Sequence, residues 1–384
     1  MQTLLITGAR APVALHLARL LGQAGYKIVL ADSFKHPLGA ACRFATYVQI
    51  PAPADGLTPY ANAINAVIND YDIDLIIPTC EEVFYLAMLV AQDALSAPLD
   101  APSLDHLTTA HNKFAFIEQL SSFGIPVPQT QLLQTTQDVQ DLVPNAAEYV
   151  FKPVWSRFAS RVLIKPTEAE LADVRPTHRA AWVAQKHIEG REISVYAYAR
   201  SGTVIALSAY HSLFRAGLGA GVCFEPVMSD RIQAFVARYV QKTAWTGQIS
   251  FDLIEAADGT IWPIECNPRA TSGLHFFTDS APFADAVCDG GPFVAPDATG
   301  LLGVRLALWV YGLPNAIRHG RLGQFKTALQ DTQDILDWPT DPAPKKRQFR
   351  ALCEIAATAL KHRISLQTAS TRDIEWDGPD TTAL

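Results

Sequence analysis

The first hundred residues alternate between short apolar strand patterns and helix patterns, and this alternation restricts the fold more than any other feature of the chain. Three strand patterns are each followed by a helix pattern: TLLITG by 11–24, YKIVLAD by 60–70 and DLIIPTC by 81–95. Strands that are joined through helices pair in parallel, with the helices covering the sheet. We therefore predict an α/β fold that begins with a doubly wound parallel sheet over residues 1–100.

The rest of the chain divides into three further predicted regions. A boundary rich in Pro and Asp is followed by short apolar runs up to residue 188, which predict a small mixed sheet. Mostly strand patterns follow to residue 266, and helix patterns at 300–320 and 346–362 predict a C-terminal helical cap. We therefore predict four regions with the bounds 1–100, 101–188, 189–295 and 296–384.

One predicted hairpin, GQISFDLIEAADGTIWPIECNP (247–268), has polar residues at alternating positions of its strands. Asp258-Gly259 favours a two-residue type I′ loop, and that loop pairs Asp252 directly with Glu265. The same register pairs Ser250 with Asn267 on the same face. The opposite face is expected to meet the core, and it carries Ile249, Phe251, Leu253, Trp262, Ile264 and Cys266.

The facing carboxylates of Asp252 and Glu265 repel each other. At about 5 Å and an effective dielectric constant near 20, the repulsion costs about 3 kcal/mol. A raised carboxyl pKa or a bound divalent cation would relieve that cost, and acids that extend into solvent are the alternative. Two carboxylates and the amide of Asn267 form an oxygen ligand set that suits Mg²⁺ bridging to phosphate.

Composition argues against several classes of partner. The 384-residue chain has net charge −7 with scattered Lys and Arg, so we expect no nucleic-acid partner. The six cysteines show no CxxC pair or disulfide-framework spacing, which favours a reducing compartment. Neither a signal-peptide pattern nor an apolar run of membrane-spanning length is present, so we expect a soluble, cytoplasmic protein with no membrane partner.

The turn after the first strand raises a nucleotide alternative. Gly8 lies between a strand and a helix pattern, and Asp32 ends the second strand, which is the layout of a dinucleotide site. The second and third glycines of that fingerprint are absent, and Arg10 and Pro12 stand in the turn. An NAD(P)-dependent oxidoreductase is therefore kept as an alternative to a nucleotide-type fold that serves only as scaffold.

The Asp252-to-Glu265 spacing, the run IECNPR and several separated motifs in the expected order resemble the ATP-grasp superfamily, especially its carbamoyl-phosphate-synthase-like branch. The resemblance covers about residues 1–290. It implies a pre-ATP-grasp (Rossmann-like) domain, a two-lobed α+β ATP-grasp domain and a C-terminal helical region. The small lobe with its linking helix would be 101–188, and the large lobe with the metal site 189–295.

The resemblance also implies roles for individual residues. ATP would be bound through the phosphate-contacting lysines, the inter-lobe hinge and a ribose contact: Lys113, Lys152, Gln185, His187, Ile188 and Glu192. Mg²⁺, as two ions and with Mn²⁺ as an alternative, would be held by Asp252, Glu265 and Asn267. Lys152 and Arg269 would be catalytic, and the guanidinium fork suits Arg269 to the moving phosphate or a substrate carboxylate. Arg215 is a second candidate for the substrate carboxylate.

Two loops differ in how well they fit the family. The loop after Lys152, VWSRFASR, has no glycine, although the family's loop is glycine-rich and closes over the phosphates. Residues 211–226 keep alternating glycines at 217, 219 and 221, and this pattern predicts a mobile lid. In PTCEE (78–82), Glu81 or Glu82 would touch substrate or act only at a helix N-terminus.

The function predicted from these features is an ADP-forming carboxylate–amine ligase. Mg·ATP would activate a small carboxylate as an acyl phosphate, and an amine or amino acid would displace the phosphate. Its partners would be small molecules, and a homodimer is left open. Phosphorylation of bicarbonate or an enol oxygen, the oxidoreductase, and a non-catalytic nucleotide sensor are the alternatives.

Overall fold

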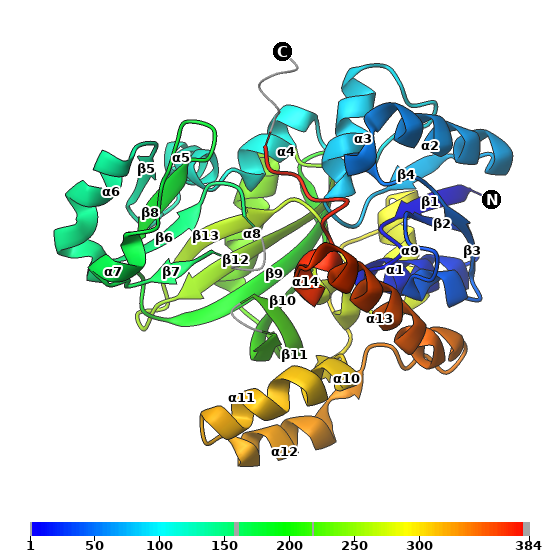
Figure 1. The fold of residues 1–384 in the computed structure, drawn as a ribbon. Coiled ribbons are helices and arrows are strands. Elements are labelled where there is room, and N and C mark those ends of the chain that lie inside the picture. Colours follow the sequence, from blue (N-terminus) through cyan, green and yellow to red (C-terminus); the bar gives the residue numbers. More distant parts are fainter. Residues whose placement is uncertain (1, 157–160, 217–218, 379–384) are drawn as a thin grey trace.

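The computed structural model describes residues 2–156, 161–216 and 219–378. The N-terminal sheet has the strand order β3-β2-β1-β4 and is parallel throughout (Figure 1). Its strands are β1 (Thr3–Thr7), β2 (Lys27–Asp32), β3 (Ala45–Gln49) and β4 (Leu75–Ile77), and its helices are α1 (Pro12–Gln23), α2 (Leu57–Tyr71) and α3 (Glu82–Ala91). The predicted parallel sheet is confirmed, with β3 as an additional edge strand.

A small sheet follows, with the strand order β5-β8-β6-β7. Its strands are β5 (Thr130–Leu133), β6 (Tyr149–Pro153), β7 (Leu163–Ile164) and β8 (Trp182–Lys186), and the helices of this region are α4 (Leu104–His111), α5 (Lys113–Ser122), α6 (Thr136–Leu142) and α7 (Glu168–Leu171). The prediction of a mixed sheet is wrong. The sheet is antiparallel because β8 lies between β5 and β6 and runs opposite to both.

A large sheet occupies the centre of the molecule, with the order β13-β12-β9-β10-β11-β14-β15 (Figure 1). Its longer strands are β9 (Arg191–Arg200), β10 (Thr203–Ala216), β11 (Ala220–Val227), β12 (Gly247–Glu255) and β13 (Ile261–Asn267), and the helices nearby are α8 (Asp230–Thr243) and α9 (Ser280–Ala284). In the part of 211–226 that the structure describes, β10 and β11 pair as a hairpin, and the lid over this segment stays a prediction. Residue 217 lies outside the described residues.

The β12–β13 hairpin has the predicted pairing at its polar end but a different loop. Asp252 pairs with Glu265 and Ser250 with Asn267, as predicted. The loop is a three-residue connection, in which Gly259 has φ of +77° and Ala256 bonds to Thr260, instead of a two-residue type I′ loop. A bulge between Asp252 and Leu253 restores the register, because Ile264 has no partner in the pairing. The bulge also buries Pro263, while Trp262 and Ile264 are half-buried.

The C-terminal region is helical, as predicted, but it also extends the large sheet. Its helices are α10 (Arg305–Ala307), α11 (Leu313–Arg318), α12 (Leu322–Asp331), α13 (Ala343–His362) and α14 (Leu366–Ala369). The short strands β14 (Leu302–Gly303) and β15 (Gln333–Asp334) join the edge beyond β11. After α14 the chain runs back past the N-terminal sheet toward α4 (Figure 1). Within the described ranges, no helix combines the length and apolar character that crossing a bilayer requires.

One buried cluster joins helix α3 of the N-terminal region to the large sheet. Phe84 of α3, Phe116 of α5 and Phe251 of β12 are each fully buried and belong to the same core. Burying three aromatic side chains of this size stabilises the arrangement by several kcal/mol, at about 25 cal/mol per Å² of apolar surface. The core therefore holds the carboxyl end of β4 next to the polar end of the β12–β13 hairpin.

Candidate active site

The paired acids of the hairpin are half-buried and bonded within the protein. Ser194 of β9 donates its hydroxyl to Asp252 Oδ1 at 2.7 Å, and Asn267 donates its amide to Asp252 Oδ2 at 3.1 Å. Burial raises the pKa of Asp252, and the neighbouring Glu265 charge raises it further. Because each carboxylate oxygen of Asp252 accepts a hydrogen bond, the side chain is held in one orientation. The alternative of acids that extend into solvent is therefore wrong.

Glu265 is balanced by two ammonium groups. Lys113 Nζ, at the start of α5, lies 3.5 Å from Glu265 Oε1. Burial by itself would raise the pKa of Glu265, but the charges of Lys113 and Lys152 outweigh it and hold that pKa below its ordinary value. From the sequence, a proton or a metal ion would reduce the repulsion between the facing carboxylates. In the structure, the charges of these two lysines also reduce it.

Lys152 is buried between the small sheet and the hairpin. Its Nζ donates to Gln185 Oε1 at 3.0 Å and to the Ile264 carbonyl, the bulged residue, at 2.9 Å. Desolvation lowers the pKa of Lys152 to about 8, although the charge of Glu265 opposes the shift. Gln185 in turn donates to Thr130 Oγ1 at 3.1 Å. An ammonium that is buried with so little counter-charge is suited to an incoming anion.

The predicted hinge is partly occupied by the protein itself. The His187 N–H donates to the Glu148 carbonyl at 2.8 Å, so it is not available to an adenine ring. Desolvation lowers the pKa of the His187 imidazole. Beyond the hinge, Glu192 forms an ion pair of 2.6 Å with Arg215. The structure therefore joins the predicted ribose contact to the predicted substrate contact.

Arg269 connects the hairpin with the N-terminal sheet. Its Nη2 donates to Asn267 Oδ1 at 3.3 Å, and its Nε lies 3.7 Å from Glu81 Oε1. Glu81 directly precedes α3 and is buried. Its neighbour Glu82 instead accepts bonds from the Thr7 hydroxyl and from the Thr79 and Cys80 N–H groups, which gives it a structural role. Of the two acids weighed from the sequence, Glu81 is the one that faces the candidate site.

Three residues near the site were not anticipated from the sequence. Ser194 could be anticipated only if it were known that β9 lies beside β12, because that pairing places Ser194 opposite Asp252. His111 is buried beside Lys113, and its charge contributes to the lowered pKa of Glu265. Trp376 donates its backbone N–H to Glu81 Oε2 at 3.1 Å from 295 residues along the chain. No short-range sequence pattern carries any of these contacts.

The donor set fits Mg²⁺ on condition that further oxygens come from a ligand. Asp252, Glu265 and Asn267 present carboxylate and amide oxygens, which hard divalent cations prefer. In the part of the chain that the structure describes, no group of three His, Cys, Asp or Glu side chains could hold a metal ion. An ion at this place would therefore complete its coordination with the phosphate oxygens of a nucleotide.

In the predicted dinucleotide site, the carboxylate of Asp32 is already occupied by Arg10. Arg10 donates its Nε and Nη2 to the Asp32 carboxylate at distances of 2.6–3.1 Å, and the Arg10 backbone N–H bonds to the same group. Gly8 has φ of +80°, and a Cβ there would come within 2.6 Å of Thr79 Oγ1. Asp32 thus serves to hold Arg10, and the oxidoreductase alternative loses its ribose contact.

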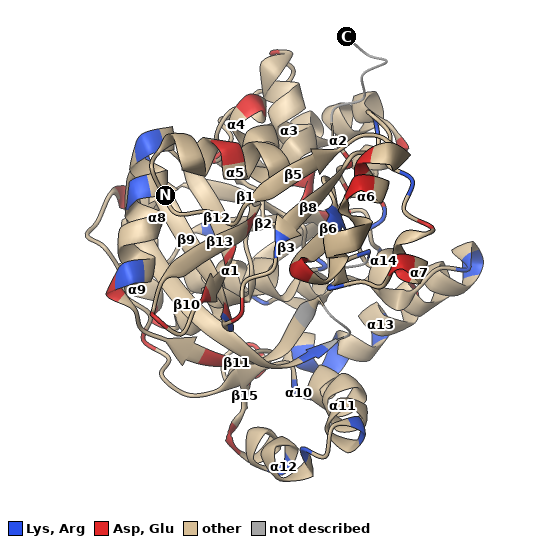
Figure 2. Cartoon of the chain, turned by 90° about the vertical axis from the view of Figure 1, so that its left-hand side faces the viewer, with Lys and Arg blue, Asp and Glu red and all other residues tan. Residues whose placement is uncertain are grey.

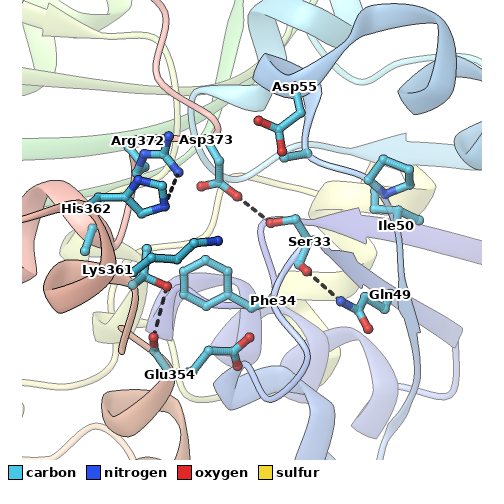
Figure 3. Close-up of a pocket in the computed structure, with 14 residues that line it drawn as sticks. Ser33, Phe34, Gln49, Ile50, Asp55, Glu354, Lys361, His362, Arg372 and Asp373 are labelled. Atoms are coloured by element: carbon cyan, nitrogen blue, oxygen red, sulfur yellow. Dashed lines mark hydrogen bonds between the residues drawn. The ribbon is translucent and has the colours of Figure 1, made fainter. Parts of the chain in front are cut away.

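A cavity of about 650 Å³ lies at the other side of Asp32, between the ends of β2 and β3 and the helices α13 and α14 (Figure 3). Residues from both regions line it, among them Ser33, Glu354 and Arg372. Its lining, as far as the described residues show it, includes none of the residues predicted to bind ATP. The candidate active site is therefore separate from this cavity.

Residues 110–273 match the ATP-grasp domain family. This segment of the chain is therefore similar to an ATP-grasp domain. The match begins in α4 and ends after Arg269, so the matching segment contains both lysines, the hinge and the acidic hairpin. Among curated protein sequences, none matches the chain.

Solved structures share the fold of this chain at low sequence identity. N5-carboxyaminoimidazole synthetase from Staphylococcus aureus is 14% identical with a TM-score of 0.59, over 78% of this chain and 80% of that one. L-amino acid ligase from Bacillus licheniformis is 16% identical with a TM-score of 0.58, over 75% and 74%. Phosphoribosylamine–glycine ligase from Thermotoga maritima is 16% identical with a TM-score of 0.58, over 78% of each chain. These likenesses establish the shared fold.

The charge distribution agrees with a site for a small anionic ligand. Figure 2 shows basic residues distributed over several elements of the protein, with acidic residues between them. The cations that converge in the described site are Lys113, Lys152 and Arg269, which stand next to Glu265 and Asn267. A compact group of this kind suits a phosphate chain better than an extended polyanion.

Proposed function

We propose that this protein is an ADP-forming ligase that uses Mg·ATP to activate a small carboxylate and joins it to an amine. The observation that carries the proposal is the meeting of Lys113 and Lys152 with Glu265 at one end of the β12–β13 hairpin. Two buried ammonium groups beside paired carboxylates form a site for phosphates and a divalent cation together. The match to the ATP-grasp domain family supports the same assignment.

In the proposed complex, the nucleotide replaces contacts that its binding residues now make within the protein. Lys113 and Lys152 bind phosphate oxygens, which replace part of their present contacts with Glu265 and the Ile264 carbonyl. Gln185, the His187 carbonyl and Ile188 meet the adenine edge, since the His187 N–H is already bonded. Glu192 binds the ribose after exchanging its ion pair with Arg215.

Asp252, Glu265 and Asn267 hold Mg²⁺ in the proposed complex, as one or two ions with Mn²⁺ as an alternative. When bound, the metal supplies charge neutralisation for phosphoryl transfer. Arg269 orients the transferring phosphate or the substrate carboxylate from the Asn267 side, and Lys152 stabilises the phosphate from the opposite side. Arg215, whose charge also acts on Asp252, is a second contact for the substrate carboxylate.

The proposal also covers the domain bounds, the class of substrate and the cellular location. The domain bounds 1–100, 101–188, 189–295 and 296–384, small-molecule substrates and a cytoplasmic location are proposed on the grounds already given, and a homodimer is left open. An amine acceptor is supported by the fold shared with an L-amino acid ligase and a phosphoribosylamine–glycine ligase. A biotin carboxylase domain in complex with MgADP and bicarbonate also shares the fold, which keeps phosphorylation of bicarbonate, in place of a larger carboxylate, as the second candidate.

The proposed function is tested by measuring phosphate and ADP release in a screen of carboxylic acids crossed with amino acids. The expected result is release of ADP that depends on Mg²⁺ and on both substrates. Bicarbonate alone and each acid alone serve as controls for the second candidate. ATP binding without ADP release under every mixture would favour a nucleotide sensor, and stabilisation by NADH without stabilisation by Mg·ATP would favour the oxidoreductase.

A further inference from the structure

The C-terminal strap, residues 370–378, crosses from the N-terminal sheet to the ATP-grasp domain. It leaves α14 beside the ends of β2 and β3 and runs toward α4 (Figure 1). At its start Arg10 donates to the Ser370 carbonyl at 3.1 Å and pairs with Asp373. Ser33 also donates its hydroxyl to Asp373, as Figure 3 shows. The strap is therefore fixed to the turn that follows β1.

The middle of the strap is buried against α3. Trp376, 6% exposed, stacks on Phe84 with ring centroids 5.4 Å apart and planes 2° apart. Tyr85 packs edge-on against the same indole, and its hydroxyl donates to the Glu375 carbonyl at 2.7 Å. Stacked and edge-to-face contacts of this kind fix the ring and the backbone next to it. Phe84 belongs to the core between α3 and the large sheet, so Trp376 is fixed relative to both.

The backbone N–H of Trp376 connects the strap to the candidate active site. The Trp376 N–H donates to Glu81 Oε2 at 3.1 Å, and Glu81 Oε1 faces Arg269 Nε at 3.7 Å. The two oxygens of one carboxylate thus connect the strap to the arginine. Because the carboxylate is planar, holding one oxygen in place also fixes where the other presents its charge.

The end of the strap contacts the small lobe. Gly378 has φ of +97°, and a Cβ there would lie 2.6 Å from Trp155 Nε1. Trp155 directly precedes Ser156, whose carbonyl accepts a bond from Lys113 Nζ at 2.9 Å. The strap therefore lies against the site on the Arg269 side and against the segment that holds Lys113.

We propose that the strap completes the active site, with Trp376 and Glu81 as positioning residues that orient Arg269 toward the phosphate. This inference rests on the proposed function, because it takes Arg269 to be a phosphate contact. It makes the last described residues of the chain part of the phosphate site, although they lie outside the residues that match the ATP-grasp domain family. Losing Trp376 should weaken binding at Arg269 and leave the nucleotide contacts of the two lysines intact.

The test uses Mg·ADP and inorganic phosphate as probes. Isothermal titration gives the Kd of Mg·ADP, and then the Kd of phosphate for protein saturated with Mg·ADP. We expect Trp376→Ala to weaken phosphate binding about tenfold while the Kd of Mg·ADP stays within about twofold. Trp376→Phe, which retains a ring on Phe84, should restore most of the phosphate affinity. Trp309→Ala is the matched control, because Trp309 is 48% exposed and packs on Phe325 of α12.

A second variant keeps the test decisive if Trp376→Ala does not fold. Glu81→Gln retains an oxygen for the Trp376 N–H but removes the charge that faces Arg269, so it should lower phosphate affinity to a similar extent. Unchanged phosphate affinity in the folded variants, or a parallel loss of Mg·ADP and phosphate, would overturn the role of the strap. If the wild-type protein bound no Mg·ADP, the proposed function would be contradicted and the strap's role with it.

Discussion

Lys113, the first residue of α5, lies 3.5 Å from Glu265 on β13, and this ion pair links the helix to the acidic hairpin. Lys113 is 1% exposed at its side chain, whereas Glu265 is 20% exposed. The pair therefore opens to solvent on the side of the carboxylate. A phosphate or a metal ion can approach Glu265 without first unburying the lysine, and this asymmetry suits a site that binds a nucleotide with its cation.

The first prediction concerns Lys113. Lys113→Met should weaken Mg·ATP binding by about 10–100-fold, because a charge-assisted hydrogen bond contributes about 1.5–3 kcal/mol. It should also raise the pKa of Glu265, since the lysine charge now holds that pKa down. Glu265 must be ionised to bind a metal ion, so the acid limb of the kcat/KM profile should move to higher pH. Lys113→Arg should leave the limb in place, and an unmoved limb in the Met variant would contradict the assignment.

The second prediction concerns the pH dependence of nucleotide binding. Desolvation lowers the pKa of Lys152 to about 8, so the ammonium is charged below that pH and becomes neutral above it. The affinity for Mg·ADP should therefore fall as pH rises from 8 to 9.5, by up to about tenfold per pH unit. Titration calorimetry across this range measures the slope. Lys152→Met should bind weakly at every pH with a flat profile, and equal slopes in the two proteins would exclude Lys152 as the titrating group.

The third prediction concerns the paired acids. Glu265→Gln should reduce ADP release by about 10²–10³-fold or more, because it removes a charge from the phosphoryl-transfer site. The fold should remain intact, which circular dichroism and the Tm would show. Glu255→Gln is the matched control, since Glu255 lies on the same hairpin opposite Ile261 and outside the site. Wild-type ADP release by the Glu265 variant would refute the metal assignment.

The fourth prediction concerns the docking of the C-terminal region on α1. Arg19 is fully buried and donates to Asp341 Oδ2 at 2.9 Å. Asp341→Ala leaves the guanidinium buried without its partner and should cost about 3–5 kcal/mol of stability. Replacing both residues, as Arg19→Met with Asp341→Leu, should recover most of the lost Tm. Calorimetry of the three proteins measures this, and a double variant as unstable as Asp341→Ala would contradict it.

The elements with strong apolar periodicity were predictable, and the weakly patterned ones were not. β1 is buried along its whole length, so its apolar run was evident. β3 is a half-exposed edge strand, and α4 has few buried residues, so neither stands out from a loop. Gly221 of β11 is one of the glycines that suggested a lid, and it is required there because a Cβ would clash with Ser212 Oγ.

The candidate site was predictable where it depends on local register. Asp252 faces Glu265 as expected, although the loop and the bulge each shift the register by one residue and cancel. The contacts of Ser194 and Trp376 depend on which distant segments meet, and that is decided by packing of the whole core. The occupied His187 N–H likewise depends on Glu148 across the small sheet. Such contacts lie beyond the reach of sequence spacing.

The central claim is that a carboxylate attacks ATP within the site formed by Asp252, Glu265 and the lysines. It is tested most directly by following ¹⁸O from a labelled carboxylate that supports ADP release in the substrate screen. The account predicts that one ¹⁸O atom per turnover appears in inorganic phosphate, because the acyl phosphate forms through the carboxylate oxygen. Unlabelled phosphate released together with ADP, or AMP and pyrophosphate as products, would contradict it.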